Sequence, residues 1–281
     1  MGIRTDLAVE AYDLWQQENG HPGRLSGVTS HARTCRGVQI HTVRILSQAA
    51  ARQLQKPQGV YVTLELDPLC RREPAAFSRT VQALSSTLRR LIPAGEHVLV
   101  VGLGNSAVTP DAVGPLAVKS VIATRHMQSL VKAAGGALGT VSTLEPGVLG
   151  TTGVESLETV SAVARQTKPD RIIVIDALAA AAPARICAAV QLTNTGIVPG
   201  SGVGNRRAAF SQQTLGVPVI AIGVPTVVDA QTLRPDAPNG MIVIPRDIDA
   251  RVREIAQLVG YALDLTLHRG LRQEDIPCFL A

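Results

Sequence analysis

The sequence contains few aromatic, charged and cysteine residues. Phe, Trp and Tyr make up 2% of its 281 residues, and so few rings count against a nucleic-acid surface on which bases stack. Charged residues are 17% of the chain, and the arginines behind the net charge of +5 are scattered, so no basic groove is indicated. The four cysteines, Cys35, Cys70, Cys187 and Cys278, form no CxxC pair. We therefore expect the reduced thiols of a cytosolic protein rather than a disulfide framework or a zinc site.

Long apolar segments are also missing. No apolar run reaches the ~18 residues that a membrane helix needs. Asp6 stands where the apolar part of a secretory leader would begin. We expect a cytoplasmic protein that has neither a membrane segment nor a nucleic-acid partner.

The chain is instead rich in aliphatic residues. Hydrophobic residues make up 46% of it, which is enough for a substantial core in a chain of this length. Three continuous apolar runs, at 97–104, 171–176 and 217–224, are typical of strands that are buried on both faces of a parallel sheet. Segments with helical spacing lie between the runs, so the pattern predicts βαβ units and an α/β fold with a mainly parallel sheet.

Further elements are expected from alternating and helical patterns. The helix nearest the start of the chain is expected to have Thr5 as its N-cap. The additional strands are expected at 38–46, 60–66, 186–192 and 241–244, and the helices at 5–18, 75–92, 205–214 and 247–268 and after Glu155.

Two aspartates follow apolar runs, at the sheet edge where open α/β folds bind their ligands. Asp111 lies in Thr109-Pro110-Asp111, a predicted helix start, and Asp176 ends the second run. Each has an ordinary explanation, because an acid favours the first turn of a helix and Asp176 could cap the Ala-rich segment that follows it. As a pair, two buried carboxylates would repel each other, and one would hold a proton near neutrality. Such a pair could activate water and protonate a leaving amine.

Glycine-rich loops beside these aspartates are candidates for backbone donors. The loop 196–205 could form an anion nest or a peptide cradle, and it fits a tight turn before a helix equally well. The spacing Gly102-x-Gly104-x-x-Ala107 matches a relaxed dinucleotide fingerprint, but the acidic ribose ligand expected ~20 residues later is missing. The candidate substrate-binding or oxyanion residues are Gly102, Gly104, Asn105, Gly200, Ser201, Gly202 and Gly204.

Several long motifs, read together, resemble the germination protease of spore-forming bacteria. They occur in one order between about residues 4 and 268, which makes the resemblance specific. The motifs are RTDLAVEA from Arg4, KPxGxYVTLE from Lys56, GLGNxxVTPDAxGP at 102–115, PGVLGxTG at 146–153, IDALAA at 175–180, TGIxPGSGVGN at 195–205 and LGVPVIAIGVPTVVDA at 215–230.

The resemblance implies an endopeptidase that degrades small acid-soluble spore proteins during germination, in the forespore or spore core. It implies a three-layer α/β sandwich similar to the hydrogenase-maturation endopeptidases, no cofactor and no metal, and assembly as a homotetramer. The two proposed catalytic aspartates of the family fall on Asp111 and Asp176. Germination proteases are made as zymogens, so residues 1–15 are expected to be a propeptide region and residues 16–281 a single α/β peptidase domain.

The sequence departs from the family pattern at two places, and it leaves two alternative functions open. Thr151 stands where the family usually has Gln, and the stretch from Val228 to Met241 is shorter than in typical members. One alternative is a metal-dependent maturation-type peptidase, with His126 as a possible third ligand beside the aspartates. The other is a non-catalytic module that binds an anion or a nucleotide through the glycine loops.

Overall fold

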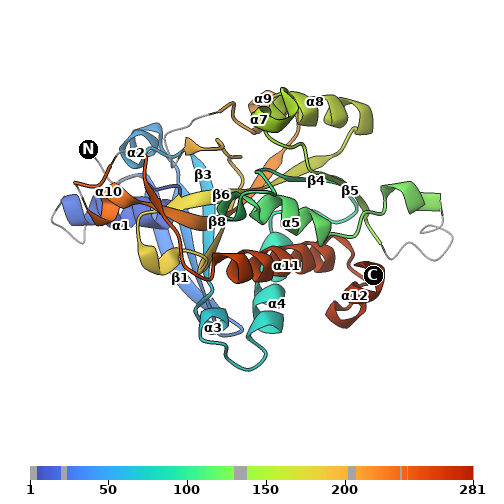
Figure 1. Ribbon diagram of the computed structural model, residues 1–281, viewed down its shortest axis with the longest axis horizontal. Helices are drawn as coiled ribbons and strands as arrows, with labels where there is room; N and C mark the ends of the chain where they lie inside the picture. Colours follow the sequence, from blue (N-terminus) through green and yellow to red (C-terminus); the bar gives the residue numbers. More distant parts are fainter. Residues whose placement is uncertain are drawn as a thin grey trace.

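The chain folds around one mixed β-sheet that is covered by helices on both faces. The structure is a computed structural model that describes residues 5–19, 24–129, 138–201, 207–234, 236–238 and 240–280 (Figure 1). Helices and strands alternate through most of the chain. The α/β class predicted from the apolar runs is confirmed.

The described residues form a nine-stranded sheet with the strand order β1-β2-β3-β7-β8-β6-β4-β5, in which β9 also pairs with β8. The strands are β1 (Val28–Cys35), β2 (Val38–Ile45), β3 (Gly59–Glu65), β4 (His97–Gly102), β5 (Thr140–Leu144), β6 (Arg171–Ala180), β7 (Ala189–Thr193), β8 (Val219–Asp229) and β9 (Ile242–Val243).

The α-helices vary from single turns to twenty residues. They are α1 (Ala8–Glu18), α2 (Gln48–Leu54), α3 (Asp67–Cys70), α4 (Ala76–Leu88), α5 (Val113–Lys119), α7 (Leu149–Thr152), α8 (Ser156–Thr167), α9 (Gln212–Leu215), α10 (Ala230–Leu233), α11 (Ile248–Leu267) and α12 (Ile276–Leu280). Short 3₁₀ helices include η1 (Thr109–Asp111) and η2 (Arg125–Met127).

The sheet has a parallel part and an antiparallel part that meet at β8. Strands β5, β4, β6 and β8 run parallel. The continuous apolar runs predict β4, β6 and β8, whereas β5, with the sequence TVSTL, is not among the predicted strands. Strands β1, β2, β3 and β7 are joined by antiparallel pairing, and β7 joins β8 in the same way. The first of these, β1, is not among the predicted strands, because most of its residues are exposed and polar and so give no apolar pattern.

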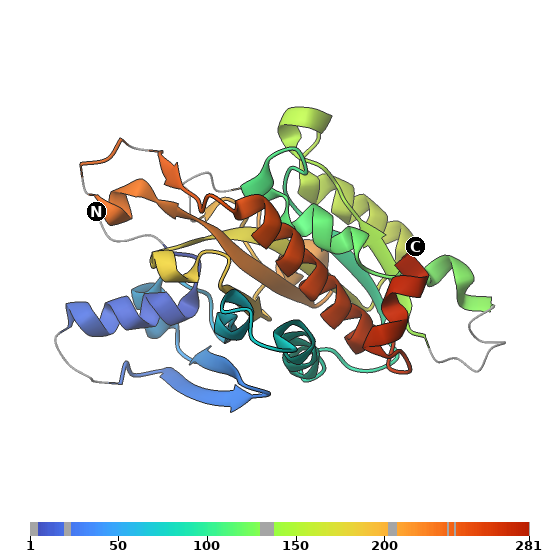
Figure 2. The ribbon, with the colours of Figure 1, turned by 60° about the horizontal axis from the view of Figure 1, so that its bottom comes forward.

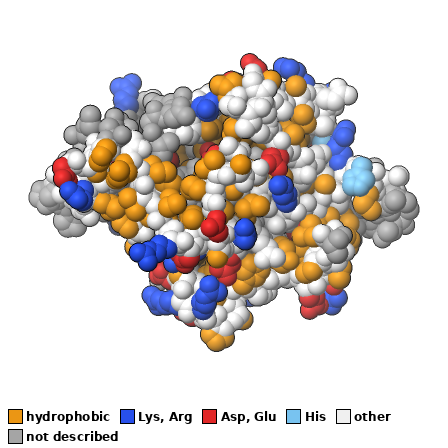
Figure 3. All heavy atoms as spheres, in the orientation of Figure 1, with side chains coloured by type: hydrophobic (Ala, Val, Ile, Leu, Met, Phe, Trp, Pro, Cys, Tyr) orange, Lys and Arg blue, Asp and Glu red, His pale blue; other side chains and the backbone are white. Residues whose placement is uncertain are grey.

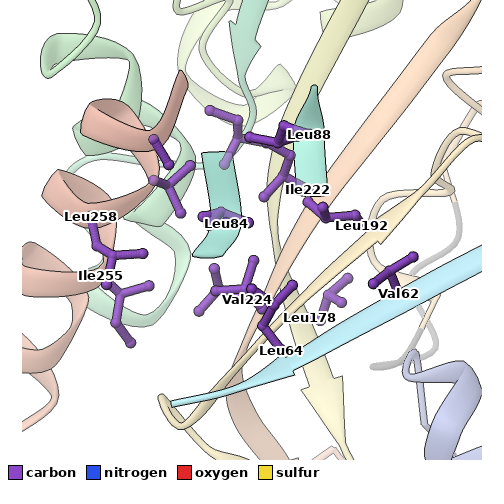
Figure 4. Packing of buried hydrophobic residues seen from close by; sticks show 14 of the residues in the cluster. Val62, Leu64, Leu84, Leu88, Leu178, Leu192, Ile222, Val224, Ile255 and Leu258 are labelled. Carbon is purple, nitrogen blue, oxygen red and sulfur yellow. The ribbon is translucent and has the colours of Figure 1, made fainter. Parts of the chain in front are cut away.

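Helices cover both faces of the parallel part and complete three layers (Figure 2). On one face α11 packs against α4 and α5, and α5 contacts β4 and β6. In Figure 4, Leu84 and Leu88 of α4 and Ile255 and Leu258 of α11 lie near strand side chains such as Val224. On the other face, α8 closes a second apolar cluster over β4, β6 and β8. Successive side chains of β6 point to opposite faces of the sheet and so contribute to both apolar clusters, which is why its sequence is one continuous apolar run.

Three local predictions are wrong. The first helix begins at Ala8 rather than after Thr5, and its N-cap position is Leu7. The Thr5 hydroxyl instead accepts the Leu7 N–H at 3.0 Å and donates to Glu10, so Thr5 orders the turn before the helix. Of the helix expected at 205–214, the described part is helical only at Gln212–Leu215.

The third error concerns Asp176, which does not end its strand. Strand β6 continues to Ala180, so the Ala-rich segment is part of the sheet and is not a helix that Asp176 could cap. Its pairing with β8 shifts register between Leu178 and Ala179. A side chain that lies inside a strand is held by pairing on both sides of it, which places the Asp176 carboxyl more firmly than a strand terminus would.

The face of the molecule seen in Figure 3 carries charges of both signs. On the face shown in Figure 3, basic and acidic side chains are interspersed among apolar ones. In the part of the chain that the structure describes, no helix is both long enough and apolar enough to cross a membrane.

Candidate active site

The site is built at the ends of β4 and β6, which are neighbouring parallel strands. Gly102 at the end of β4 pairs with Ile175, and the Leu103 N–H donates to the Ile175 carbonyl at 2.8 Å. After β4 the chain passes through α5, on one face of the sheet, and enters β5, which lies on one side of β4. After β5 the chain passes through α8, on the other face of the sheet, and enters β6, which lies on the opposite side of β4. Such a reversal of strand order opens a crevice at the carboxyl ends of the strands.

Asp111 turns back towards the end of β4. It lies in η1, the short helix that begins at Thr109 and has Val108 at its N-cap position. Its Oδ2 accepts the Asn105 N–H at 2.8 Å, so the loop after β4 closes on the carboxylate. Asn105 is one of the predicted site residues, and its main chain has a defined role in holding Asp111.

Close packing explains the two glycines of this loop. A Cβ at Gly104, which has φ +114°, would lie 2.0 Å from the Asp111 carbonyl oxygen and 3.1 Å from Asp111 Oδ1. A Cβ at Gly102 would lie 2.1 Å from Val118 and 2.3 Å from the Gly114 carbonyl oxygen. Gly102 therefore lets α5 approach β4, and Gly104 lets Asp111 approach its own loop. The predicted donation by their N–H groups to a substrate stays a prediction.

Asp176 is a buried carboxyl on the strand next to Asp111. Its side chain is 5% exposed, and its Oδ1 accepts the Ala177 N–H at 2.9 Å. Burial raises its pKa well above the ordinary value, and the charge of Asp111 raises that pKa further. The structure thus brings the two predicted aspartates close enough for their charges to interact electrostatically.

The two carboxyls differ in how well their charged forms are stabilised. Burial also raises the pKa of Asp111, but the Asn105 N–H and the positive charge of Arg207 lower it. Asp176 has only the Ala177 N–H to offset burial and two nearby carboxylates. When the environments of two neighbouring acids separate their pKa values in this way, the more buried acid holds the proton. Arg207, which sequence reasoning missed, is a half-buried cation that also pairs with Glu155 at 3.4 Å.

A third carboxylate, that of Asp6, comes from the start of the chain. Its N–H donates to the Ala179 carbonyl at 2.9 Å, and its Oδ2 accepts the Ala179 N–H at 2.9 Å. Ser201 Oγ donates to Asp6 Oδ1 at 2.7 Å. The Asp6 charge contributes to the raised pKa of Asp176. The N-terminal segment therefore lies across the strand that carries Asp176.

Gln191 holds the same segment from the other side. Its Nε2 donates to the Asp6 carbonyl oxygen at 3.1 Å, and its Oε1 accepts the Ala8 N–H at 2.7 Å. Gln191 pairs with Gly223 in β8, and Gly223 pairs with Asp176 in β6. Residues paired across a sheet point to the same face, so Gln191 and Asp176 face one side with a glycine between them.

A large cavity adjoins the row of paired residues formed by Gln191, Gly223 and Asp176. Its volume is about 1070 Å³, and its lining includes Asp6, Gln191, Ser201 and Gly223. Asp111 and Asp176 are not among its lining residues, so it lies beside the aspartate pair and is not centred on it. Its size and its position along the N-terminal segment suit an extended polypeptide.

The structure brings together most of the predicted site residues that it describes. Gly104, Asn105 and Asp111 lie in the segment that follows β4, Asp176 lies within the neighbouring strand β6, and Ser201 is linked to them through Asp6. The remaining predicted residues are Gly102, which packs beneath the loop, Gly200, which has φ +72° in the turn before Ser201, and Gly202 and Gly204, which lie outside the described residues. Within the described ranges, no three His, Cys, Asp or Glu side chains are grouped so that they could hold a metal ion.

A family model described as germination protease matches residues 8–239 of this chain. The chain belongs to the germination protease family. Three relatives, all germination proteases, show how far the similarity extends. The protein of Caldanaerobacter subterraneus subsp. tengcongensis is 35% identical, over 98% of this chain and 97% of its own length. That of Clostridium tetani is 33% identical over the whole of both chains. That of Bacillus cytotoxicus is 41% identical, over 98% of this chain and 77% of its own length.

The family resemblance inferred from the motifs is confirmed by these matches. Membership makes the chain a peptidase of spore germination. Among solved structures, the [NiFe] hydrogenase maturation protease HycI from Thermococcus kodakarensis is similar, with a TM-score of 0.39 and 18% identity. That match covers 63% of this chain and 98% of HycI.

Proposed function

We propose that this protein is an endopeptidase that degrades small acid-soluble spore proteins during germination, with water activated between Asp111 and Asp176. The observation that carries the proposal is the electrostatic coupling of Asp111, in the turn that follows β4, with Asp176, within the neighbouring strand β6, in a chain of the germination protease family. The named substrate follows from what the motifs imply. The spore core as the compartment and a homotetramer as the assembly are further parts of the proposal.

The unequal environments of the two acids assign their roles. Asp111 is the better stabilised anion, because it has the Asn105 N–H and the Arg207 charge nearby, so we assign it as the general base. Asp176 is buried and has a strongly raised pKa, so we assign it as the general acid. A pair of carboxyls whose pKa values differ in this way can transfer protons in both directions near neutral pH.

Hydrolysis then needs no group beyond water and the two side chains. Asp111 takes one proton from the water as its oxygen bonds to the carbonyl carbon. Asp176 gives its proton to the nitrogen as the C–N bond breaks, which leaves a carboxyl and an amine. The second water proton remains on the new carboxyl group, so the protons balance. Backbone N–H groups of the glycine loops are the candidate donors to the developing oxyanion.

The N-terminal segment supports a zymogen. Asp6 and its neighbours lie across β6 as an extended substrate would, with main-chain and side-chain hydrogen bonds. Leu7 and Ala8 are fully buried and Tyr12 is 7% exposed, all three within the main core. Removal of the whole predicted propeptide region, residues 1–15, would therefore open the core. We propose that the residues before Leu7 are removed and that α1 stays with the domain.

The proposal is tested by mixing the purified protein with a small acid-soluble spore protein and mapping the fragments by mass spectrometry. Asp111→Asn and Asp176→Asn keep the size of each side chain but remove its ability to exchange a proton. Both variants are expected to lose at least about 100-fold in rate, the usual contribution of a general acid or base. Cleavage at the wild-type rate by either variant would refute the dyad.

A chelator distinguishes the metal-dependent alternative. The same digestion is repeated after treatment with EDTA and after addition of single divalent metals. Unchanged activity agrees with the water mechanism. Loss of activity on chelation, with recovery in one metal, would favour a maturation-type peptidase instead.

A further inference from the structure

One buried residue, Gln191, contacts the main chain of the N-terminal segment on both sides of the Asp6–Leu7 bond, and the proposed mechanism does not use it. Gln191 is 5% exposed and lies in β7 between apolar neighbours. Its amide spans the Asp6–Leu7 bond, because it donates to the Asp6 carbonyl and accepts from the Ala8 N–H. Both of these hydrogen bonds are to main-chain groups, so Gln191 would bind any residue type at these positions.

The sheet fixes the position of this amide relative to the general acid. Gln191, Gly223 and Asp176 are paired in succession across β7, β8 and β6. Two strand spacings separate Gln191 from Asp176, about 10 Å between backbones. Gly223 lies between them, and the side chain of Leu178 fills the space that a Cβ at Gly223 would occupy. The N-terminal segment bridges the two strands around this point, because the Asp6 carbonyl accepts from Gln191 of β7 while the Asp6 N–H and carboxylate bind Ala179 of β6.

Resting on the proposed function, we propose that Gln191 binds the carbonyl oxygen of the peptide bond to be cleaved. In the full chain that bond is Asp6–Leu7. Gln191 Nε2 would polarise the carbonyl and then stabilise the negative charge that forms on its oxygen as water adds to the carbon. Gln191 Oε1, bound to the N–H two residues further on, would fix the register of the chain over Asp176. Gln191 thus becomes a carbonyl-binding residue of the site.

A simpler role for Gln191 must be separated from this one. Ala8 begins α1, and the first N–H groups of a helix need acceptors from outside the helix. Gln191 Oε1 provides one, so the residue could serve as a helix cap alone. The two roles use different atoms, since a cap needs only the acceptor oxygen and carbonyl binding needs only the donor nitrogen.

Gln191→Glu separates the two roles. The introduced carboxylate keeps an acceptor for Ala8 but loses the donor to Asp6, and it regains a donor when it is protonated. Gln191→Met keeps the length of the side chain and removes both functions at every pH. The assay follows the shortening of the full-length chain at its N-terminus by intact mass, between pH 5 and pH 8. Each rate is divided by the wild-type rate at the same pH, which removes the titration of the aspartate pair.

The proposal expects Gln191→Met to be about 100-fold slower than wild type across the range, the usual effect of removing one oxyanion donor. Gln191→Glu is expected to be as slow at pH 8 and to recover as the pH falls through the pKa of the new carboxyl. A cap alone predicts wild-type rates for Gln191→Glu at every pH, and that result would overturn the proposal. So would a ratio for Gln191→Glu that stays low and constant from pH 8 to pH 5.

Controls keep folding and the proposed function apart from this inference. Thr63→Val removes a buried hydroxyl on β3, at the residue paired with Gln191, and it is expected to stay within about 2-fold of wild type. Thermal unfolding of every variant checks the fold. If the wild type digests spore protein and Asp176→Asn does not, while Gln191→Met shortens itself at the wild-type rate, the carbonyl-binding role fails and the proposed function stands. If the wild type digests spore protein but never shortens itself, the inference also fails alone.

Discussion

The contact between Gly104 and Asp111 provides a direct test of how the site is held. A methyl group at Gly104 would lie 2.0 Å from the Asp111 carbonyl oxygen, whereas real side-chain carbons almost never come within 3.0 Å of another atom. The loop in Gly104→Ala must therefore move by about 1 Å. A shift of that size at a reacting group is expected to cost about 100-fold in rate. The positive φ adds about 1–3 kcal/mol of strain to the folded state.

Gly95→Ala is the matched control for that strain. Gly95 also has a positive φ, +81°, but nothing lies within 4 Å of its Cβ position. We expect Gly95→Ala to lower the free energy of unfolding by about 1–2 kcal/mol and to leave the rate of spore-protein digestion within about 2-fold. Gly104→Ala should lose both stability and activity. If the two variants digest substrate equally well, the idea that this contact positions Asp111 is wrong.

Three further predictions follow from the buried charges. Asp111→Asn should lower the pKa of Asp176, because the neighbouring charge is removed while burial remains; ¹³C NMR titration of the carboxyl would show a rise or no change if the coupling is absent. Burial raises the pKa of Asp264 to about 7, so the stability it contributes is full below about pH 4 and is lost as the pH rises towards 7. This loss in the free energy of unfolding amounts to up to about 4 kcal/mol. Asp264→Asn should remove it from urea unfolding measured between pH 4 and pH 8, and the same pH dependence in the variant and the wild type would contradict the prediction. Arg185→Met should destabilise the protein by about 2 kcal/mol in denaturant unfolding at pH 7, because buried Glu10 loses a cationic partner 3.5 Å away; an unchanged midpoint would count against that ion pair.

The sequence predicts the parallel strands β4, β6 and β8 and singles out the two aspartates for the same reason. Strands buried on both faces read as apolar runs, and a carboxyl close to such a run is conspicuous, as with Asp111 and Asp176. The antiparallel edge was harder to predict because β1 is mostly exposed and polar. Thr5 satisfied the local rule for an N-cap, but the cap acceptor for α1 comes from Gln191, 183 positions away. Local patterns cannot register such a contact.

Gln191 and Arg207 were missed for different reasons. A glutamine inside the apolar run 186–192 is a buried polar group that needs partners, and that signal was available in the sequence. Arg207 carries no such signal, because it is one of many scattered arginines and its electrostatic effect on Asp111 depends on the tertiary structure. The sequence therefore singles out the two aspartates proposed to transfer protons, whereas Gln191, proposed to bind the peptide carbonyl, and Arg207, which lowers the pKa of Asp111, are placed by the three-dimensional arrangement.

The site depends on register at the junction of the two parts of the sheet. Side chains alternate between faces along a strand, so a slip of one residue between β7 and β8 would turn Gln191 away from the face that Asp176 shares. The irregularity in β6 between Leu178 and Ala179 lies just beyond Asp176. Irregularities of this kind change the direction in which strand groups point and are frequent beside active sites. Here the N–H and the carbonyl of Ala179 both bind Asp6. The same strand thus carries Asp176, the proposed general acid, and, three residues later, the main-chain groups that hold the N-terminal segment.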